Sequence, residues 1–415
     1  MKILQINNYN YLKGGSEKVY QESIKLLIKN GHQVNYFSIS SPYDDIICEG
    51  KSIEVNLWKD AKNIIEKIKA VRNFIYNRKV AYELDQYLRL NRPDVAHLHI
   101  FYGTLSNSVV DILKKHRIPI VQTVHEFRLL CPCYTCLTPS LNICEHCAST
   151  IFKLPCIYKK CIKSNLPMSL IAALECFVRD RFFNYQKEIA AFIMVSQFIM
   201  NKHLQYYPKI SSKCIQIYNS VDVAIYKRYS IPGRDKENYY LYLGRLSYEK
   251  GVRTLIDVFI KNPNLKLKIA GTGPADDELK KLILQSNASN IEFLGFVSGE
   301  LLYRTIAFAR YTMVPSEWYE NNPLSVIESL ALGTPVIGSR IGGIPELIEH
   351  GCNGFLHEAR SEDSLCKVLR QAEQLTLKEY EAMCEYSQQI AFEKFDNEIY
   401  YEKLITLYKR IINNE

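Results

Sequence analysis

Two acidic side chains, Glu320 and Glu328, lie eight residues apart in the most informative stretch of the sequence. Pro323 between them suits the first turn of a helix, where its missing N–H group is not needed. We therefore expect Glu320 in the loop before this helix and Glu328 inside it. Carboxylates accept hydrogen bonds in fixed directions and suit the hydroxyl groups of a sugar. Free N–H groups at the helix start predict an anion site, and an acidic surface helix is the alternative. These N–H groups belong to Asn322, Leu324 and Ser325.

A second candidate group follows a predicted strand, in the segment 244–251. Arg245 offers a forked donor and Lys250 a point charge, and the two are five residues apart across a turn. Both side chains could reach one diphosphate group. The segment lacks the glycine spacing of a nucleotide P-loop. Two solvated cations in a loop are the alternative interpretation.

Weaker signals stand at the ends of other predicted strands. Gly14 and Gly15 follow the first strand, and glycines there let backbone N–H groups approach an anion closely. Gly273 follows a strand of the second half, and His125 closes the strand predicted at 119–124. Turn geometry explains the glycines equally well, and a single histidine at a strand end is often structural.

Seven of the thirteen cysteines fall in one segment, 131–165. In a reducing cytoplasm this clustering indicates metal binding or free thiols rather than disulfides. Four of them are spaced Cys-x2-Cys-x8-Cys-x4-Cys, roughly as in a tetrahedral zinc site. Free buried thiols and an iron–sulfur or redox role stay open as alternatives. The predicted structural zinc ligands are Cys144, Cys147, Cys156 and Cys161.

The elements that must position these side chains alternate strand and helix through both halves of the chain. This alternation is typical of doubly wound parallel sheets, and 415 residues fit two to three domains. We predict an α/β fold with two Rossmann-like domains, 1–220 and 221–390. A C-terminal helix within 391–415 is expected to pack back on the first domain. Ligands of open α/β sheets bind beyond the carboxyl ends of the strands, so we expect the two domains to face a cleft there.

Composition and charge narrow the classes of protein. Hydrophobic residues make up 47% and charged residues 23%, which excludes disordered, collagen-like and coiled-coil proteins. The longest apolar stretch, near 189–200, is shorter than the roughly 20 residues of a membrane span. The N-terminus lacks the apolar core and cleavage site of a signal peptide, so we expect a cytoplasmic protein.

The charge is uneven along the chain. Residues 1–220 hold 29 Lys and Arg against 17 Asp and Glu, a net charge of +12, whereas 221–415 carry −4. The first half is therefore expected to face an anionic partner, such as a membrane surface, a lipid diphosphate or a nucleic acid. Scattered solvating lysines are the alternative. The basic residues are not organised with a recognised nucleic-acid motif, so nucleic acid is the least expected of the three.

Taken together, these motifs resemble glycosyltransferase family 4, a large family of retaining, nucleotide-sugar-dependent enzymes with the GT-B fold. The resemblance is strongest over 239–357 and extends to the N-terminal half, where Gly14-Gly15-Ser16-Glu17 and His125 match the family pattern. The remaining motifs are Glu320-x7-Glu328, Gly-Arg-Leu-Ser-Tyr-Glu-Lys-Gly at 244–251, Ala-Gly-Thr-Gly-Pro at 270–274, Phe-Leu-Gly-Phe-Val at 293–297 and Gly-Gly-Ile-Pro-Glu-Leu-Ile at 342–348.

The resemblance implies a role for each matching residue. Arg245 and Lys250 would bind the donor diphosphate and stabilise its charge as it leaves, so that no catalytic divalent metal is required. Glu320 would bind hydroxyls of the donor sugar near the reacting carbon, and Glu328 would hold the ribose. His125 would lie near the donor sugar and complete the catalytic set. The implied donor-binding residues are Gly14, Gly15, Gly273, Val297, Asn322, Pro323, Leu324, Ser325 and Glu328.

The resemblance also implies the substrates. The donor is expected to be a UDP- or GDP-sugar, and the acceptor a glycan or a polyprenyl-diphosphate-linked sugar at the inner membrane face. The product would belong to a cell-surface polysaccharide such as a capsule, an O-antigen or an exopolysaccharide. Alternatives are a sugar-nucleotide epimerase or phosphorylase, and a catalytically silent sugar-nucleotide-binding scaffold of a polysaccharide assembly complex. Basic residues that could face the membrane are Lys62, Lys67, Lys69, Arg72, Arg78, Lys79, Lys159, Lys160 and Lys163.

Overall fold

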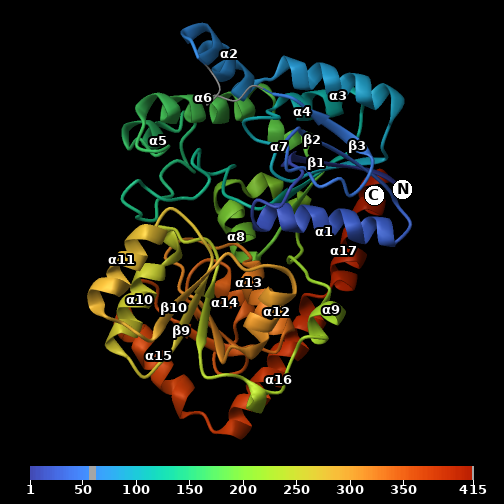
Figure 1. Ribbon diagram of the computed structural model, residues 1–415. Helices are drawn as coiled ribbons and strands as arrows, with labels where there is room; N and C mark the ends of the chain where they lie inside the picture. The colour runs from blue at the N-terminus through green and yellow to red at the C-terminus, as the bar shows by residue number, and fades with distance from the viewer. Residues whose placement is uncertain (56–61, 414–415) are drawn as a thin grey trace. The chain divides into compact units, whose positions relative to one another are not determined.

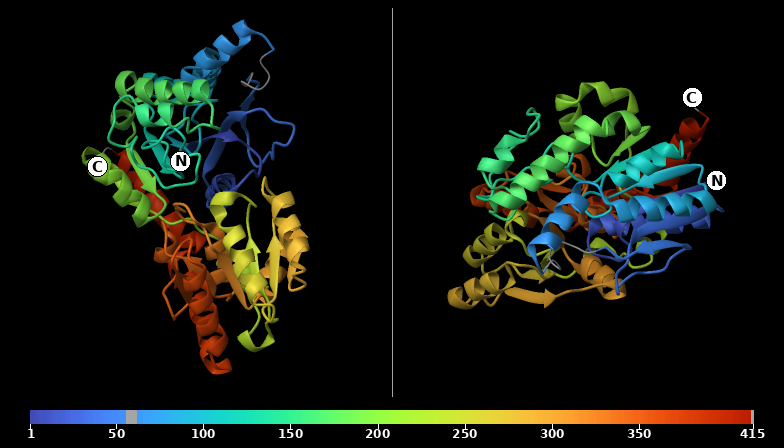
Figure 2. Two further views of the ribbon diagram at one scale, coloured as in Figure 1. Left: turned by 90° about the vertical axis from the view of Figure 1, so that its left-hand side faces the viewer. Right: turned by 90° about the horizontal axis from the view of Figure 1, so that it is seen from above.

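A computed structural model describes residues 1–55 and 62–413. The chain divides into two compact units, Met1–Ile217 with Tyr401–Glu415, and Tyr218–Tyr400. In Figures 1 and 2 the first unit runs from blue to green, with the red C-terminal end, and the second from yellow-green to orange-red. Residues 391–400 were expected in the C-terminal segment but belong to the second unit, where α16 (Leu377–Lys394) packs against α13 (Leu324–Ala331).

The first unit is built on a seven-stranded sheet in the order β3-β2-β1-β4-β5-β6-β7. Every neighbouring pair is parallel, and β1 lies beside both β2 and β4. This is the strand order of a Rossmann-like fold, which confirms the predicted class. The strands are β1 (Lys2–Tyr9), β2 (Gln33–Ile39), β3 (Gly50–Ile53), β4 (Val95–Leu98), β5 (Ile120–Val124), β6 (Ala191–Met194) and β7 (Cys214–Gln216).

The helices of the first unit include one break that the sequence did not predict. The segment 59–90 was expected to be mostly helical, and its first three residues lie outside the described residues. The first helix ends at Ile75, with Tyr76 extended, and Asn77 caps the start of the next, because its side chain accepts hydrogen bonds from Lys79 N (3.2 Å) and Val80 N (3.3 Å). The helices are α1 (Gly15–Lys29), α2 (Ile64–Ile75), α3 (Arg78–Leu90), α4 (Ser108–Lys115), α5 (Leu154–Tyr158), α6 (Leu166–Phe182), α7 (Tyr185–Glu188) and α8 (Gln197–Tyr206).

The C-terminal end of α17 (Asn397–Ile412) belongs to the first unit. The Tyr401 hydroxyl lies 2.8 Å from His32 Nε2, and the buried Tyr408 hydroxyl lies 2.6 Å from His97 Nδ1. These hydrogen bonds attach the end of the chain to the sheet of the first unit. Within residues 1–55 and 62–413, no helix combines the length and the apolar character that a membrane crossing requires.

The second unit has a six-stranded parallel sheet in the order β10-β9-β8-β11-β12-β13, again a Rossmann-like order. Side chains of β8 alternate between two buried clusters, with Tyr240 and Tyr242 in one and Leu241 in the other. Helices therefore cover both faces of the sheet, as a parallel sheet requires (Figure 2). The strands are β8 (Tyr240–Leu243), β9 (Leu267–Ala270), β10 (Ile291–Gly295), β11 (Tyr311–Val314), β12 (Val336–Ser339) and β13 (Gly354–His357). Besides α13 and α16, the helices are α9 (Val223–Lys227), α10 (Val252–Lys261), α11 (Asp276–Ser286), α12 (Gly299–Phe308), α14 (Ile344–Leu347) and α15 (Glu362–Gln374).

Candidate active site

The structure brings together two of the predicted catalytic residues, Lys250 and Glu320. Lys250 lies between β8 and α10, and Glu320 lies in the loop between β11 and α13. Lys250 Nζ donates a 2.6 Å hydrogen bond to Glu320 Oε1. The same oxygen accepts from Ser316 Oγ at 2.7 Å and from Trp318 Nε1 at 2.9 Å. A charged pair thus forms at the carboxyl edge of the second sheet, where ligands of this fold class bind.

The environment of Glu320 keeps its carboxylate ionised. Only 7% of the residue is exposed. Burial acts to raise the pKa of Glu320, but the charge of Lys250 and the three hydrogen bonds outweigh it, so that the pKa lies below its ordinary value. The Lys250 ammonium also lies 5.3 Å from the centre of the Trp318 ring. The site therefore presents a fixed negative acceptor and a fixed cation side by side.

Two glycines let neighbouring loops approach the pair. Gly342 has φ +61°, and a Cβ built there would lie 2.2 Å from the Glu320 carbonyl oxygen. The next amide, Gly343 N, donates to that oxygen at 2.7 Å. Gly251 has φ +69°, and its Cβ would lie 2.0 Å from the Pro315 carbonyl oxygen. Only glycine fits both the dihedral angle and the space, so these positions fix the loop that holds Glu320.

The structure places Gly273 and Val297 in neighbouring loops of the same sheet. A Cβ on Gly273 would lie 2.2 Å from the Leu246 carbonyl oxygen, so the loops after β8 and β9 touch through their backbones. Leu246 N donates to Thr272 O at 3.0 Å across the same contact. Val297, just after β10, is half-buried and packs against an apolar cluster of the second unit. The roles of Gly273 and Val297 toward the donor stay predictions.

The side chain of Arg245 does not contact the Lys250–Glu320 pair. Its side chain is exposed, and the described part of the chain gives its guanidinium no hydrogen bond or ion pair. Its carbonyl oxygen accepts from the Tyr242 hydroxyl at 2.8 Å, which fixes the backbone of the turn. The structure thus joins one of the two predicted cations to Glu320 and leaves the other turned to solvent.

The start of α13 carries the remaining donor-binding candidates. Pro323 is extended, with ψ 119°, and stands directly before Leu324 rather than in the first turn where it was expected. Asn322 is buried. Its Oδ1 accepts from Asn219 N at 2.8 Å, and its carbonyl oxygen accepts from Asn219 Nδ2 at 2.9 Å. The first amides of a helix have no partner within it, so those of Leu324 and Ser325 can serve an anion.

Glu328 lies inside α13, as predicted, and is almost completely buried. Its Oε1 accepts a 3.4 Å hydrogen bond from the hydroxyl of Tyr226, which lies on α9. Burial, together with the charge of Glu328, raises the pKa of Tyr226 far above its ordinary value, so this hydroxyl stays a donor. Sequence reasoning missed Tyr226, because it lies 102 residues from its partner and belongs to no motif.

In the first unit, Gly14 and Gly15 lie at the start of α1. Gly15 is the first residue of the helix, and Gly14 precedes it in extended conformation. A Cβ on Gly14 would come no nearer than 3.5 Å to another atom, namely Glu17 Oε2. Space alone therefore does not require this glycine, and its proposed approach to an anion stays a prediction.

His125 belongs to a cluster of three histidines. His97 lies on β4, His99 directly follows β4, and His125 directly follows β5. His125 Nε2 lies 3.0 Å from His99 Nδ1, and the rings of His97 and His99 stack at 4.4 Å. Burial lowers the pKa of His125 to about 4 and that of His97 to about 3, and it places that of His99 well below the ordinary value. All three rings are therefore neutral near pH 7. Sequence reasoning selected His125 and overlooked the other two.

Three of the four predicted zinc ligands interact, since burial and the nearby Cys156 raise the pKa of Cys147, and hydrogen bonds with Cys133 and Cys156 raise that of Cys161. Lys159 Nζ donates to Cys144 Sγ at 3.4 Å, while the Cys147 thiol lies 3.9 Å from Lys153 O. The Cys156 thiol lies 4.0 Å from Ser169 O. Within residues 1–55 and 62–413, no three His, Cys, Asp or Glu side chains are grouped to hold a metal ion. Zinc at these four cysteines therefore stays a prediction, which metal analysis tests.

Comparisons with known proteins agree with this geometry. Residues 227–390 match the family model described as "Glycosyl transferases group 1". A 42.6 kDa protein in the cps region of Klebsiella pneumoniae is 24% identical over 379 residues, which cover 88% of this chain and 92% of that protein. A glycosyltransferase of Methanocaldococcus jannaschii is 37% identical over 142 residues, which cover 33% of this chain and 36% of that relative, about a third of its length.

The solved structure of HepE from Anabaena in complex with UDP superimposes with a TM-score of 0.70 at 17% identity. The superposition covers 99% of this chain and 100% of that one, so the two share the GT-B fold. The family match lies in the second unit and contains both Lys250 and Glu320. Residues 227–390 therefore match a glycosyl transferase group 1 domain, and the comparisons support the glycosyltransferase superfamily for this chain.

Proposed function

We propose that this protein is a retaining glycosyltransferase of family 4 that moves a sugar from a UDP- or GDP-sugar to a glycan or lipid-linked acceptor. The observation that carries the proposal is the Lys250–Glu320 pair at 2.6 Å beside the start of α13. Solved structures of HepE with UDP and with UDP-glucose support a nucleotide-sugar donor. The relative in a cps region supports a role in cell-surface polysaccharide.

The donor would use the residues of the second unit as follows. The ionised Glu320 accepts hydrogen bonds from hydroxyls of the transferred sugar, and Glu328 accepts from the ribose. The Lys250 ammonium and the Arg245 guanidinium bind the diphosphate. The amides of Leu324 and Ser325 add partial positive charge to the same end of the donor. Val297 and Gly273 border the base and the phosphates.

In the proposed reaction the bond between the sugar carbon and the diphosphate oxygen breaks as the acceptor oxygen attacks the same face. The acceptor hydroxyl gives its proton to an oxygen of the leaving diphosphate, which keeps the balance of charge. Negative charge grows on the diphosphate in the transition state, and Lys250 and Arg245 lower its energy there. The proposal also assigns His125, Gly14 and Gly15 to the donor sugar and its phosphates, and it requires no catalytic divalent metal.

We further propose that the protein works on the inner membrane face. Helix α2 buries none of its residues and exposes three isoleucines, Ile64 by 70%, Ile65 by 74% and Ile68 by 64%. Lys67 and Lys69 lie exposed between and beside them. Apolar and basic side chains on one helix suit an anionic lipid surface, and each basic residue adds about 1 kcal/mol near such a surface. Sedimentation with anionic vesicles at low and high salt tests this, and absence of binding at low salt refutes it.

A donor screen tests the proposed activity. We expect one nucleoside diphosphate-sugar among uridine, guanosine and adenosine donors to raise the melting temperature of the full chain. The same donor should release nucleoside diphosphate slowly without acceptor. A silent scaffold would show the thermal shift without any release, and a chain that shows neither effect with any donor would contradict the proposal.

A further inference from the structure

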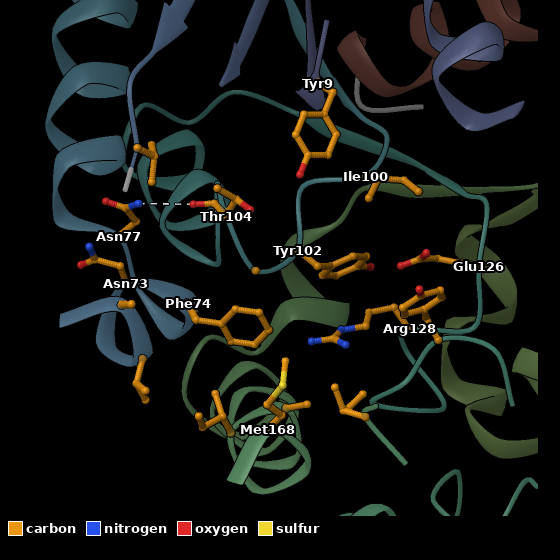
Figure 3. A pocket seen from close by; sticks show the side chains of 18 of the residues that line it. Tyr9, Asn73, Phe74, Asn77, Ile100, Tyr102, Thr104, Glu126, Arg128 and Met168 are labelled. Carbon is orange, nitrogen blue, oxygen red and sulfur yellow. Dashed lines mark hydrogen bonds between the residues drawn. The ribbon is translucent and has the colours of Figure 1, made fainter. Parts of the chain in front are cut away.

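A pocket of about 670 Å³ lies within the first unit, apart from the donor residues of the second. Its walls come from α2, α6 and the loops that follow β1, β4 and β5 (Figure 3). The volume falls within the range of pockets that hold small-molecule ligands. Glu17 of the Gly14-Gly15-Ser16-Glu17 motif lines it, and the proposed donor chemistry gives that side chain no role.

One end of the pocket is apolar. In Figure 3, Phe74 of α2 points into it from the left and Met168 of α6 points into it from below. Val71 of α2, together with Ile171 and Ala172 of α6, completes this wall. A polar ligand group placed against such a wall would lose its water without gaining a hydrogen-bond partner. This part of the pocket therefore favours a hydrocarbon group.

Beside this apolar wall lies a buried cation, Arg128. The residue is 6% exposed, and its guanidinium donates to Glu175 Oε2 at 2.9 Å and to Pro132 O. Its Nε is buried and lacks a hydrogen-bond partner in the described part of the chain. A buried donor without a partner costs about 1–3 kcal/mol, which an anionic ligand group would recover. The guanidinium lies 5.8 Å from the centre of the Phe74 ring, so the cation and the apolar wall adjoin.

Further charges line the pocket. Lys13 and Lys163 are exposed there, and Glu17 and Glu126 are the acidic groups. Burial raises the pKa of Glu126 to about 7, so this carboxyl is only partly ionised near neutral pH. Three cations, Arg128, Lys13 and Lys163, line the pocket with two carboxyls, Glu17 and Glu126, and Glu175 pairs with Arg128. The two exposed lysines therefore supply the positive charge that an anionic group would meet.

The two helices that wall the pocket are apolar on their outer sides as well. Successive helix residues are about 100° apart, so Ile68 of α2 lies nearly opposite Ala70 and Asn73, which line the pocket, whereas Ile64 shares a face with Val71 of the pocket wall. On α6, Leu166, Leu170 and Leu174 are exposed, while Met168, Ile171 and Ala172 line the pocket. An apolar chain that leaves the pocket between these helices would meet apolar rather than polar surface.

We propose that this pocket binds an amphiphile, with its apolar chain between α2 and α6 and its phosphate group at Arg128, Lys13 and Lys163. If the pocket is the acceptor site, which rests on the proposed function, the acceptor is a phosphate-bearing lipid. Free phosphate shares only the head-group chemistry, and a free alcohol shares only the chain.

Titration calorimetry with the full chain separates these ligands. Farnesyl diphosphate, farnesol and inorganic pyrophosphate are titrated in the presence of saturating UDP, which covers diphosphate binding in the second unit. We expect farnesyl diphosphate to bind at least tenfold more tightly than either fragment. Pyrophosphate binding as tight as farnesyl diphosphate would show an anion site alone, equal binding of farnesol would show an apolar site alone, and either result would overturn the proposal.

A matched pair of variants places the binding. Ala70→Trp fills the pocket from α2, and Ile68→Trp puts the same ring on the outer side of the same helix. Because α2 has no fully buried residue, both variants should fold, which circular dichroism checks. We expect Ala70→Trp to weaken farnesyl diphosphate binding at least tenfold and Ile68→Trp to leave it unchanged. Equal affinity of both variants would show that the ligand binds elsewhere.

Lys163→Gln tests the head group. Its effect should be a three- to tenfold loss for farnesyl diphosphate with no change for farnesol, and an unchanged affinity for farnesyl diphosphate would refute the phosphate assignment. The thermal shift with nucleotide-sugars reports on the second unit. Loss of that shift with retained lipid binding would therefore refute the proposed transfer activity and leave the pocket assignment intact.

Discussion

Replacing Lys250 by methionine removes the cation of the candidate active site and keeps most of its aliphatic stem. In the native chain the ammonium lies 2.6 Å from Glu320 Oε1, and the side chains are 25% and 9% exposed, so solvent screens the pair weakly. Removing one partner of a buried pair costs about 3–5 kcal/mol. Ser316 and Trp318 still donate to the carboxylate, and the buried Glu320 can take up a proton once the cation is gone. We therefore expect a smaller loss of about 1–3 kcal/mol in the free energy of unfolding.

The same substitution should lower turnover about 10²- to 10³-fold, because charge on the leaving diphosphate loses a fixed donor. Nucleoside diphosphate release at saturating donor measures turnover, and urea unfolding measures stability. Lys280→Met is the matched control, since Lys280 pairs with Asp276 on the exposed surface of the same unit. If the Lys250 variant turned over like the native chain, or the Lys280 variant lost as much, the assigned role of Lys250 would be wrong.

Three further results follow from the structure. The histidine cluster is neutral when folded but takes up protons near pH 6.5 when unfolded. Its contribution to the free energy of unfolding is therefore complete above that pH and is lost as the pH falls toward 4. The urea midpoint should drop across this window, and it should drop less in the His97→Phe variant. Gly342→Ala should cost well over the roughly 1 kcal/mol expected for Gly295→Ala, because both have positive φ but only Gly342 lacks space for a Cβ; thermal unfolding compares them, and equal losses would contradict the crowding. If the cysteine segment binds zinc, metal analysis should find one ion per chain that is absent from Cys144→Ser, whereas a stable metal-free native chain would exclude it.

Much of the fold could be predicted because its strands are short, buried apolar runs. β4 and β11 are four-residue segments buried throughout, and each is followed by a helical pattern. Such runs require a parallel sheet covered on both faces. The break between α2 and α3 was missed because Asn77 is one capping residue within a long helical pattern. Local capping chemistry, not hydrophobic periodicity, decides that boundary.

The candidate site was predicted to the level of loops but not of side chains. Lys250 and Glu320 are 70 residues apart, and only the rule that parallel strands share a carboxyl edge, together with the family motifs, placed them together. The same rule applied to Arg245, whose side chain is instead exposed, because a loop arginine chooses among rotamers that sequence does not determine. For His97 and His99 a signal existed: residues two apart on a strand share one face.

The pocket of the first unit could not be predicted, because a lining side chain and a core side chain have the same sequence signature. Phe74, Met168 and Ile171 are apolar residues of helices and would normally be assigned to the core. These three residues line a pocket because parts of the chain that are far apart in sequence, such as those around Tyr9 and Arg128, leave a space unfilled beside them. Arg128 shows the converse, since an isolated arginine in sequence predicts solvent, whereas here it is buried beside Glu175. Long-range packing thus decides where the first unit leaves room between its side chains, and sequence motifs indicate less about that pocket than about the loops of the second unit.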